Sequence, residues 1–357
     1  MEPGAGTGEG APSAPGRPAL PWKVRLMLFA LNVASGLSMR RDGTINRSVF
    51  SLFDRRARAS ARPDVRGVRS ADVEVDASRG LWARVFSPSE AAASASPLPV
   101  VVYFHGGGFA LLSAASVPYD AMCRRFCREL GAVVVSVDYR LAPEHRCPAA
   151  YEDGVDVLRH LANAGLPDGV AVSVDLSRCF LAGDSAGANI AHHVAQRWTT
   201  ACVASSSSVP RSSPFRLAGV VLVQPYLGGE ERTDAEVRLD GKVPVVTVRG
   251  SDWMWRAFLP EGADRNHPAA HVTDENADLA DGFPPAMVVI GGLDPLQDWQ
   301  RWYADVLRRK GKAVRVVEFP EAIHTFFIFP ELPDCARLVE AMKAFIDDSN
   351  ASSDSAA

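Results

Sequence analysis

One serine stands in a sequence context that could make it a nucleophile. Ser185 is the centre of the GxSxG motif GDSAG, which follows an apolar run at 179–182 and precedes a helical pattern. A sharp turn between a strand and a helix lifts such a serine clear of the sheet. The start of the helix places the Ala186 N–H and a positive dipole near a developing negative charge. A glycine-rich turn would also explain the motif, but its position favours a nucleophile.

A second glycine-rich segment, upstream of the serine, could stabilise that negative charge. The sequence HGGGF at residues 105–109 closes an apolar run at 100–104. Consecutive glycines leave backbone N–H groups free to point at a substrate oxygen, as an oxyanion hole requires. We therefore expect the N–H groups of Gly107, Gly108 and Ala186 to form that hole. The two motifs together predict acyl transfer.

A nucleophilic serine needs a base, and the base needs an acid that orients it. In this type of sheet the three follow in the order serine, acid, histidine. Asp294 comes just after the apolar run 287–290, where sites in open α/β sheets collect, and His324 follows the run 314–319. We expect Asp294 and His324 to fill these roles. Asp298 is the alternative acid, although it falls at the start of a helical stretch.

We expect the remaining histidines and one charged segment to have structural rather than catalytic roles. His105 is expected to brace its loop, and His192 and His193 to lie along the helix that follows Ser185. Four further histidines follow no suitable strand and are expected to be surface or structural residues: His145, His160, His267 and His271. The segment DYRLAPEH at 138–145 is interpreted as a hydrogen-bonded corner beneath the glycine-rich loop rather than as a catalytic element.

The strands and helices that must position these residues alternate along the chain. Two half-buried strands are expected at 72–75 and 81–86, in antiparallel pairing. Short apolar runs that suit buried parallel strands lie at 100–104, 133–137, 180–182, 220–223, 287–290 and 314–319. Helical stretches are expected at 119–130, 149–162, 187–199, 298–310 and 336–346. This alternation predicts an open, mostly parallel α/β sheet with helices on both faces.

The overall composition excludes several classes of function. The chain has 357 residues, of which 47% are hydrophobic and 22% charged, which is typical of a globular protein with a sizeable core. A net charge of −4 argues against binding to nucleic acids or to anionic membranes. The six cysteines form no CxxC pair, and Cys123 and Cys127 lack further ligands, so we expect buried free thiols and neither a metal nor a cofactor.

The two ends of the chain differ from its centre. Residues 1–21 are rich in Gly, Ala and Pro and are expected to form a disordered tail rather than a targeting segment. Residues 22–65 carry apolar residues without strand alternation and are expected to be helical and to pack on the open end of the sheet. The catalytic domain is expected at 66–348, and a loose tail at 349–357. We expect a cytoplasmic monomer or weak homodimer, with the nucleus as an alternative location.

The motifs together resemble a known family. HGGGF, DYRLAPEH, GDSAGAN and GLDPLQD, followed by the late His324, are similar to the plant carboxylesterases of the hormone-sensitive-lipase-like α/β-hydrolases. The segments at 41–47, 239–242 and 252–262 are also similar to the gibberellin receptors, a branch of the same family. The resemblance implies the α/β-hydrolase fold, with residues 22–65 as an N-terminal helical lid over the pocket.

Several positions distinguish the two branches. The resemblance implies that receptors carry serine where this chain has Gly108, GDSSGGN in place of GDSAGAN, and an aliphatic residue in place of His324. Met254 also replaces an aromatic residue that the receptors place beside the hormone. This chain keeps a complete set of catalytic residues, so the sequence predicts an enzyme with a receptor-like lid.

Three functions remain open at the level of sequence. The favoured one is hydrolysis of small-molecule esters through an acyl-enzyme, with Ser185 as nucleophile. The second is a receptor that binds a hormone-like acid or lactone and recruits a partner through the lid. The third is dehydratase or transferase chemistry on a plant secondary metabolite, because some relatives of these esterases catalyse it.

Overall fold

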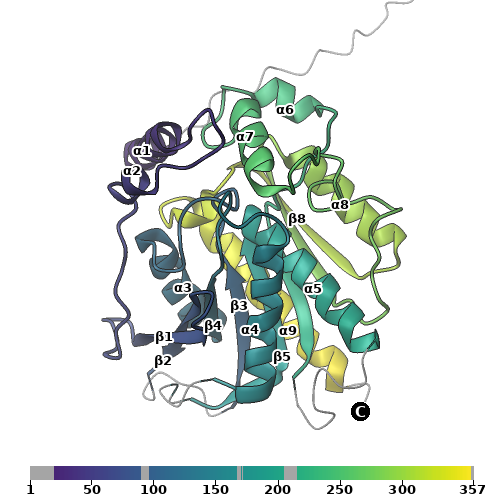
Figure 1. Cartoon of the computed structure of the whole chain (residues 1–357). Coiled ribbons are helices and arrows are strands. Elements are labelled where there is room, and N and C mark those ends of the chain that lie inside the picture. Colours follow the sequence, from purple (N-terminus) through teal and green to yellow (C-terminus); the bar gives the residue numbers. More distant parts are fainter. Residues whose placement is uncertain (1–19, 90–95, 167–169, 171, 205–214, 355–357) are drawn as a thin grey trace, which may run out of the picture.

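The centre of the protein is a single eight-stranded sheet. The computed structural model describes residues 20–89, 96–166, 170, 172–204 and 215–354 (Figure 1). The strands are β1 (Val68–Asp76), β2 (Leu81–Pro88), β3 (Leu98–Phe104), β4 (Val133–Asp138), β5 (Val174–Asp184), β6 (Leu217–Val223), β7 (Ala286–Leu293) and β8 (Val314–Ile323). Their order in the sheet is β1-β2-β4-β3-β5-β6-β7-β8.

The pairing of these strands is mostly parallel. β1 pairs with β2, and β2 with β4, in antiparallel fashion, whereas every later pair is parallel. Each predicted strand is present. The mostly parallel α/β sheet expected from the sequence is therefore confirmed. In such a sheet the carboxyl ends of the parallel strands meet at one edge, where a site can form.

Helices cover both faces of this sheet (Figure 1). They are α1 (Trp22–Ser38), α2 (Arg47–Ser51), α3 (Val117–Leu130), α4 (Ala149–Ala164), α5 (Ala186–Ala204), α6 (Asp234–Leu239), α7 (Val248–Phe258), α8 (Gln297–Arg309) and α9 (Pro333–Asp354), with a short 3₁₀ turn at Phe326–Ile328. Residues of α4, α5 and α8 belong to one apolar core, and residues of α3 and α9 to the other.

Strand β3 shows why two separate cores form. Val100, Val102 and Phe104 pack into the core that contains α4 and α5, while Val101 and Tyr103 pack into the core that contains α3. All five side chains are buried. Successive side chains of a strand point to opposite faces, so a strand covered on both sides must be apolar at nearly every position.

The structure differs from the sequence prediction at several places. The sequence does not predict α6 and α7, because they are short or lie in a segment without clear periodicity, and within the segment expected to be helical at 22–65 only 22–38 and 47–51 form helices. α9 continues to Asp354, so residues 349–354 are helical rather than loose, and residues 355–357 lie outside the described part. No glycine or proline interrupts α9 beyond its first residue, Pro333, and the Ser349 hydroxyl donates to the Phe345 carbonyl within it. Of the expected tail at 1–21, only residues 20 and 21 are described.

All six cysteines are free thiols, as expected, but they are not all buried. Cys202 is exposed and Cys147 is half-buried. No helix in the described part of the chain is both long enough and apolar enough to cross a bilayer.

Apolar packing and two polar side chains attach the N-terminal helices to the rest of the protein. Arg47, at the start of α2, donates to the carbonyl oxygens of Ala110 and Ala142 and forms an ion pair with Glu144. Trp253, in α7, donates its indole N–H to the Arg40 carbonyl at 2.9 Å. Figure 1 shows α1 and α2 at the same end of the molecule as α6 and α7.

A buried arginine joins β2 to its neighbours. Arg84 is 2% exposed and forms a bidentate ion pair with Asp72 of β1, with N–O distances of 2.7 and 2.9 Å. Its third nitrogen donates to Asp120 of α3 and to the Ala57 carbonyl. One guanidinium therefore connects two strands, a helix and the segment that leads from α2 into the sheet.

We expect Arg84→Met to lower the free energy of unfolding by about 3 kcal/mol, because Asp120 loses a buried partner and the Ala57 carbonyl loses its donor. Urea unfolding followed by circular dichroism measures this. Arg308→Met, which removes an exposed pair with Asp305 on α8, is the matched control and should change the free energy by less than about 0.5 kcal/mol. Equal effects of the two substitutions would contradict the role assigned to Arg84.

Candidate active site

Ser185 occupies a sharp turn between β5 and α5. Its φ angle is 51°, a left-handed conformation that a non-glycine residue rarely adopts. The turn is tight: a Cβ atom at Gly183 would collide with the Gly187 carbonyl, and one at Gly187 with the Phe104 carbonyl. The two glycines of the GxSxG motif are thus required because α5 starts directly against the ends of β3 and β5.

The structure brings the serine, histidine and aspartate singled out in the sequence into one hydrogen-bonded chain. The Ser185 hydroxyl lies 2.9 Å from Nε2 of His324, and Nδ1 of His324 lies 2.7 Å from Oδ2 of Asp294. All three side chains are buried. They come from the ends of three different strands, β5, β8 and β7. With Nδ1–H donating to the carboxylate, Nε2 is left as the acceptor that faces the serine.

His324 is hydrogen-bonded to Asp294 and not to Asp298. Besides His324, the Asp294 carboxylate accepts hydrogen bonds from the Leu296 N–H and from the Gln300 amide, at 2.9 and 2.8 Å. These donors fix the orientation of the carboxylate. Asp298 instead accepts the backbone N–H of Ala235 at the start of α6, so it has a structural partner elsewhere.

The glycine-rich loop has a backbone conformation that favours glycine and, in the described part of the chain, leaves N–H groups without acceptors. Gly107 and Gly108 have φ angles of 114° and 60°, which favour glycine. Within the described residues, neither their N–H groups nor that of Ala186 donate a hydrogen bond. The loop is anchored by Phe109, whose ring stacks on Phe258 of α7 with a centroid distance of 3.6 Å.

Gln224 holds the turn that carries His324, and the sequence analysis missed it. Its amide oxygen accepts the Thr325 N–H at 2.9 Å, and its amide nitrogen donates to the Ile323 carbonyl at 3.1 Å. Gln224 is fully buried and has a φ of 47°. A glutamine directly after the apolar strand β6 is the signal that could have identified it.

A buried carboxylate beside the serine supports the glycine-rich loop. Asp184 accepts hydrogen bonds from the Tyr103 hydroxyl at 2.6 Å, the Tyr119 hydroxyl at 2.9 Å and the Gly106 N–H at 3.0 Å. Burial raises the pKa of this carboxyl from 3.8 to about 6, although the tyrosine hydrogen bonds act in the opposite direction. The sequence analysis did not single out Asp184, Tyr103 or Tyr119.

The structural interpretations of the neighbouring polar residues agree with their contacts. His105 is fully buried and stacks on Tyr139, whose hydroxyl donates to the His105 carbonyl at 2.7 Å. Burial lowers the pKa of His105, so the imidazole is neutral. The Ala142 N–H donates to the Phe109 carbonyl, which places the DYRLAPEH segment against the glycine-rich loop. Across the described ranges, no cluster of side chains has the composition of a metal site.

The raised pKa of Asp184 predicts how stability depends on pH. A carboxyl with a pKa of 3.8 in the unfolded chain and about 6 in the fold stabilises the fold most below pH 3.8. This contribution, on the order of 3 kcal/mol, is lost as pH rises through 6. We expect the unfolding free energy of the natural protein to fall relative to that of Asp184→Asn between pH 4 and 7. Urea unfolding of both proteins across this range tests it; a constant difference would contradict the assignment.

Comparison with known proteins places this geometry in a family. Residues 101–328 match the family model described as the alpha/beta hydrolase fold. The gibberellin receptor GID1C of Arabidopsis thaliana is 40% identical over 341 residues, which cover 92% of this chain and 94% of the receptor. Carboxylesterase 20 of the same plant is 37% identical over 289 residues, covering 78% of this chain and 84% of the relative.

A solved structure has the same architecture. The hyperthermophilic esterase from Pyrobaculum calidifontis is 29% identical, with a TM-score of 0.69, and the match covers 91% of this chain and 97% of that one. Both the family model and the plant relatives cover most of the residues that build the sheet and the site. The chain therefore belongs to the α/β-hydrolase family, in the plant hormone-sensitive-lipase-like group that includes gibberellin receptors and carboxylesterases.

Proposed function

We propose that this protein is a serine carboxylesterase that hydrolyses carboxylic esters of small molecules through an acyl-enzyme. The observation that carries this proposal is the hydrogen-bonded chain from Ser185 through His324 to Asp294. A protein that only binds a ligand has no need of a general base 2.9 Å from a serine hydroxyl. The relationship to plant carboxylesterases supports the same reaction class.

The geometry supports a two-step reaction. Ser185 attacks the ester carbonyl while Nε2 of His324 accepts the hydroxyl proton, and the imidazolium then donates this proton to the leaving alcohol. Water activated by the same histidine releases the acid product in the second step. Asp294 keeps the proton on Nδ1 and stabilises the imidazolium.

The free backbone N–H groups of Gly107, Gly108 and Ala186 form the oxyanion hole in this proposal. They lie on the two segments that meet beside Ser185, and losing one such donor typically costs about 2.7–4 kcal/mol of transition-state stabilisation. Gly108 also lies against Met254 of α7, since a Cβ atom there would come within 2.7 Å of the Met254 sulfur. A serine at this position would need Met254 to move.

Residues 22–65 act as a cap over the substrate in the same proposal. Their helices lie at 22–38 and 47–51, and the rest of the segment is not helical. The contacts of Arg47 with the Ala110 and Ala142 carbonyls attach the cap to the chain just beyond the glycine-rich loop. The contact of Trp253 with Arg40 attaches it to α7. The cap therefore contacts the chain next to the glycine-rich loop, and it contacts α7, whose Met254 lies against Gly108.

One observation favours a second candidate function, that of a small-molecule receptor. Helix α1 exposes large apolar side chains, with exposed fractions of 69% for Trp22, 59% for Leu26 and 65% for Phe29. Exposed apolar surface of this kind is typical of a site for a protein partner. The relationship to a gibberellin receptor, which covers 92% of the chain, supports the same candidate. A receptor of this type would bind a hormone-like acid or lactone without turning it over.

The triad is tested by substitution. We expect the natural protein to hydrolyse p-nitrophenyl acetate and butyrate with many turnovers per molecule. Ser185→Ala and His324→Val should each lower kcat by about 10⁴-fold or more, because nucleophile and base act as a unit. Asp294→Asn should lower kcat to a similar extent by favouring the wrong tautomer of His324.

Asp298→Asn is the matched control for the acid, because the amide still accepts the Ala235 N–H. It should leave kcat within about twofold of the natural value, as expected of a surface substitution. No turnover by a folded natural protein, together with saturable binding of a carboxylic acid or lactone, would favour the receptor. Equal losses in Asp294→Asn and Asp298→Asn would contradict the assignment of the acid.

The cap is tested at Arg47. Arg47→Gln removes the ion pair to Glu144 and the hydrogen bonds to the two carbonyls, so we expect faster amide hydrogen exchange in residues 22–51. Because the cap would close less firmly over the substrate, KM should rise several-fold while kcat changes less. Arg55→Gln, an exposed substitution just beyond α2, is the control and should change neither. An unchanged KM in Arg47→Gln would contradict the capping role.

A further inference from the structure

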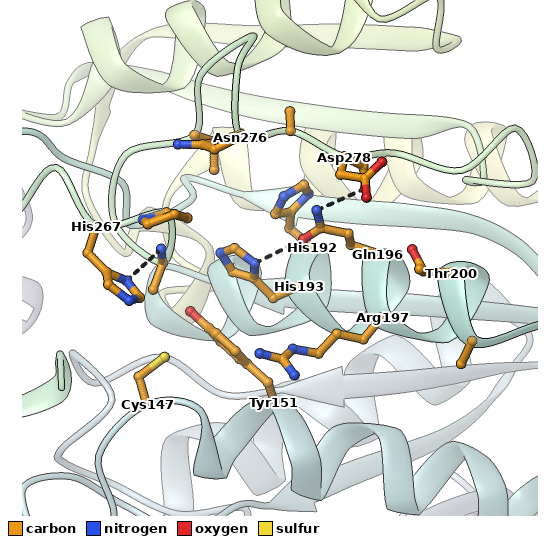
Figure 2. Close-up of a pocket in the computed structure, with 15 residues that line it drawn as sticks. Cys147, Tyr151, His192, His193, Gln196, Arg197, Thr200, His267, Asn276 and Asp278 are labelled. Atoms are coloured by element: carbon orange, nitrogen blue, oxygen red, sulfur yellow. Dashed lines mark hydrogen bonds between the residues drawn. The ribbon is translucent and has the colours of Figure 1, made fainter. Parts of the chain in front are cut away.

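A cavity of about 510 Å³ lies away from the triad, between α4, α5 and the segment at 267–278 (Figure 2). No residue of the triad lines it. Its central residue, His193, is eight positions after Ser185 on α5, which corresponds to about 12 Å along the helix axis. The volume lies within the range of roughly 300–1,000 Å³ that small-molecule sites occupy.

One wall of this cavity carries a cation without an acidic partner. Arg197 is exposed and its guanidinium lies over the ring of Tyr151, 5.5 Å from the ring centre. Throughout the described parts of the chain, no hydrogen bond or ion pair is formed by this guanidinium. Asp278 lines the cavity on the other side of α5 (Figure 2). An anionic group entering the cavity would find Arg197 free to bind it in a bidentate manner.

The floor of the cavity carries a buried polar atom without a partner. His193 is 7% exposed and stacks on Tyr151 with a centroid distance of 4.5 Å. Its Nδ1 faces the Gln196 amide oxygen at 3.4 Å, and the Gln196 amide nitrogen donates to the Asp278 carbonyl at 3.0 Å. This series of hydrogen bonds fixes the orientation of the Gln196 amide, so its oxygen faces Nδ1 of His193 and Nδ1 carries the proton. Among the described residues, Nε2 has no partner at the distance and angle of a hydrogen bond, although the Ala269 backbone lies close enough to the ring to raise the pKa of His193.

The protonation state of His193 makes Nε2 an acceptor. Burial, and then the nearby Arg197, lower the pKa of His193 to about 4, so the imidazole is neutral near pH 7. A neutral imidazole with its proton on Nδ1 offers a lone pair at Nε2. A buried polar atom that lacks a partner costs free energy, which a ligand hydroxyl would recover.

The other residues that line the cavity could pack against the carbon skeleton of a small ligand. Ala269, Val272 and Ala277 line the cavity and are buried. His267 accepts the Ala269 N–H through Nδ1 at 3.1 Å, which leaves its Nε2–H as a donor. The cavity thus combines a free guanidinium, a buried acceptor and apolar side chains within one lining.

We propose that this cavity is a second binding site, distinct from the triad, for a small hydroxylated organic acid. The carboxylate pairs with Arg197, the hydroxyl donates to Nε2 of His193, and the carbon skeleton packs against the apolar residues between them. The proposal does not depend on the catalytic function, because none of these residues belongs to the triad.

The charge requirement is tested with 4-hydroxybenzoate and its neutral analogue 4-hydroxybenzamide. Isothermal titration of the full-length protein should give saturable binding of the acid. Arg197→Gln should weaken this binding by about tenfold or more, the typical value of a charge-assisted hydrogen bond, and should leave the binding of 4-hydroxybenzamide unchanged. Arg308→Gln removes an exposed arginine outside the cavity and should change the Kd of the acid by less than twofold. Equal binding of the acid to Arg197→Gln and the natural protein would overturn the proposal.

The hydroxyl requirement is tested by comparing 4-hydroxybenzoate with benzoate. The natural protein should prefer the hydroxylated acid, and His193→Phe, which keeps an aromatic ring against Tyr151 but has no acceptor, should lose this preference. A preference that persists in a folded His193→Phe protein would overturn the role of Nε2. Because Arg197 is exposed and can be replaced without disturbing the core, the first comparison decides the proposal if His193→Phe does not fold.

Discussion

The constraint on which the site depends is the close approach of α5 to the ends of β3 and β5. At Gly187 the backbone of the helix lies against the Phe104 carbonyl, where no side chain fits. This approach forces Ser185 into a left-handed conformation and turns its hydroxyl toward His324. The same approach sets the start of α5 beside the glycine-rich loop, so the proposed nucleophile and the proposed oxyanion donors share one geometric origin.

A network of buried polar groups keeps that arrangement rigid. Asp184 ties β5 to β3 through Tyr103 and to α3 through Tyr119, and it also holds the Gly106 N–H. On the other side, Gln224 fixes the turn of His324. These groups face the apolar interior, where an unpaired polar atom would cost about 1–3 kcal/mol, so the loops that carry the chemistry have few alternative conformations.

The family contains both catalysts and receptors, and this chain combines features of each. Its Ser185, His324 and Asp294 are arranged as the proposed hydrolysis requires, while its N-terminal helices are attached by apolar packing and by two polar side chains and expose a row of apolar side chains. A cap of this kind serves an enzyme by excluding water from the acyl transfer and serves a receptor by presenting a surface. The two uses are distinguished by whether His324 acts as a base, not by the fold.

The sequence by itself determined the strands of the sheet and placed Ser185, Asp294 and His324 at strand ends. It could do so because buried parallel strands are short apolar runs and because their carboxyl ends must meet at one edge. Only the tertiary structure decided the partners of Asp184, the role of Gln224 and the walls of the cavity beside His193. Those contacts join residues far apart in the chain whose side chains follow no periodic pattern, and they exist only once the helices pack on the sheet.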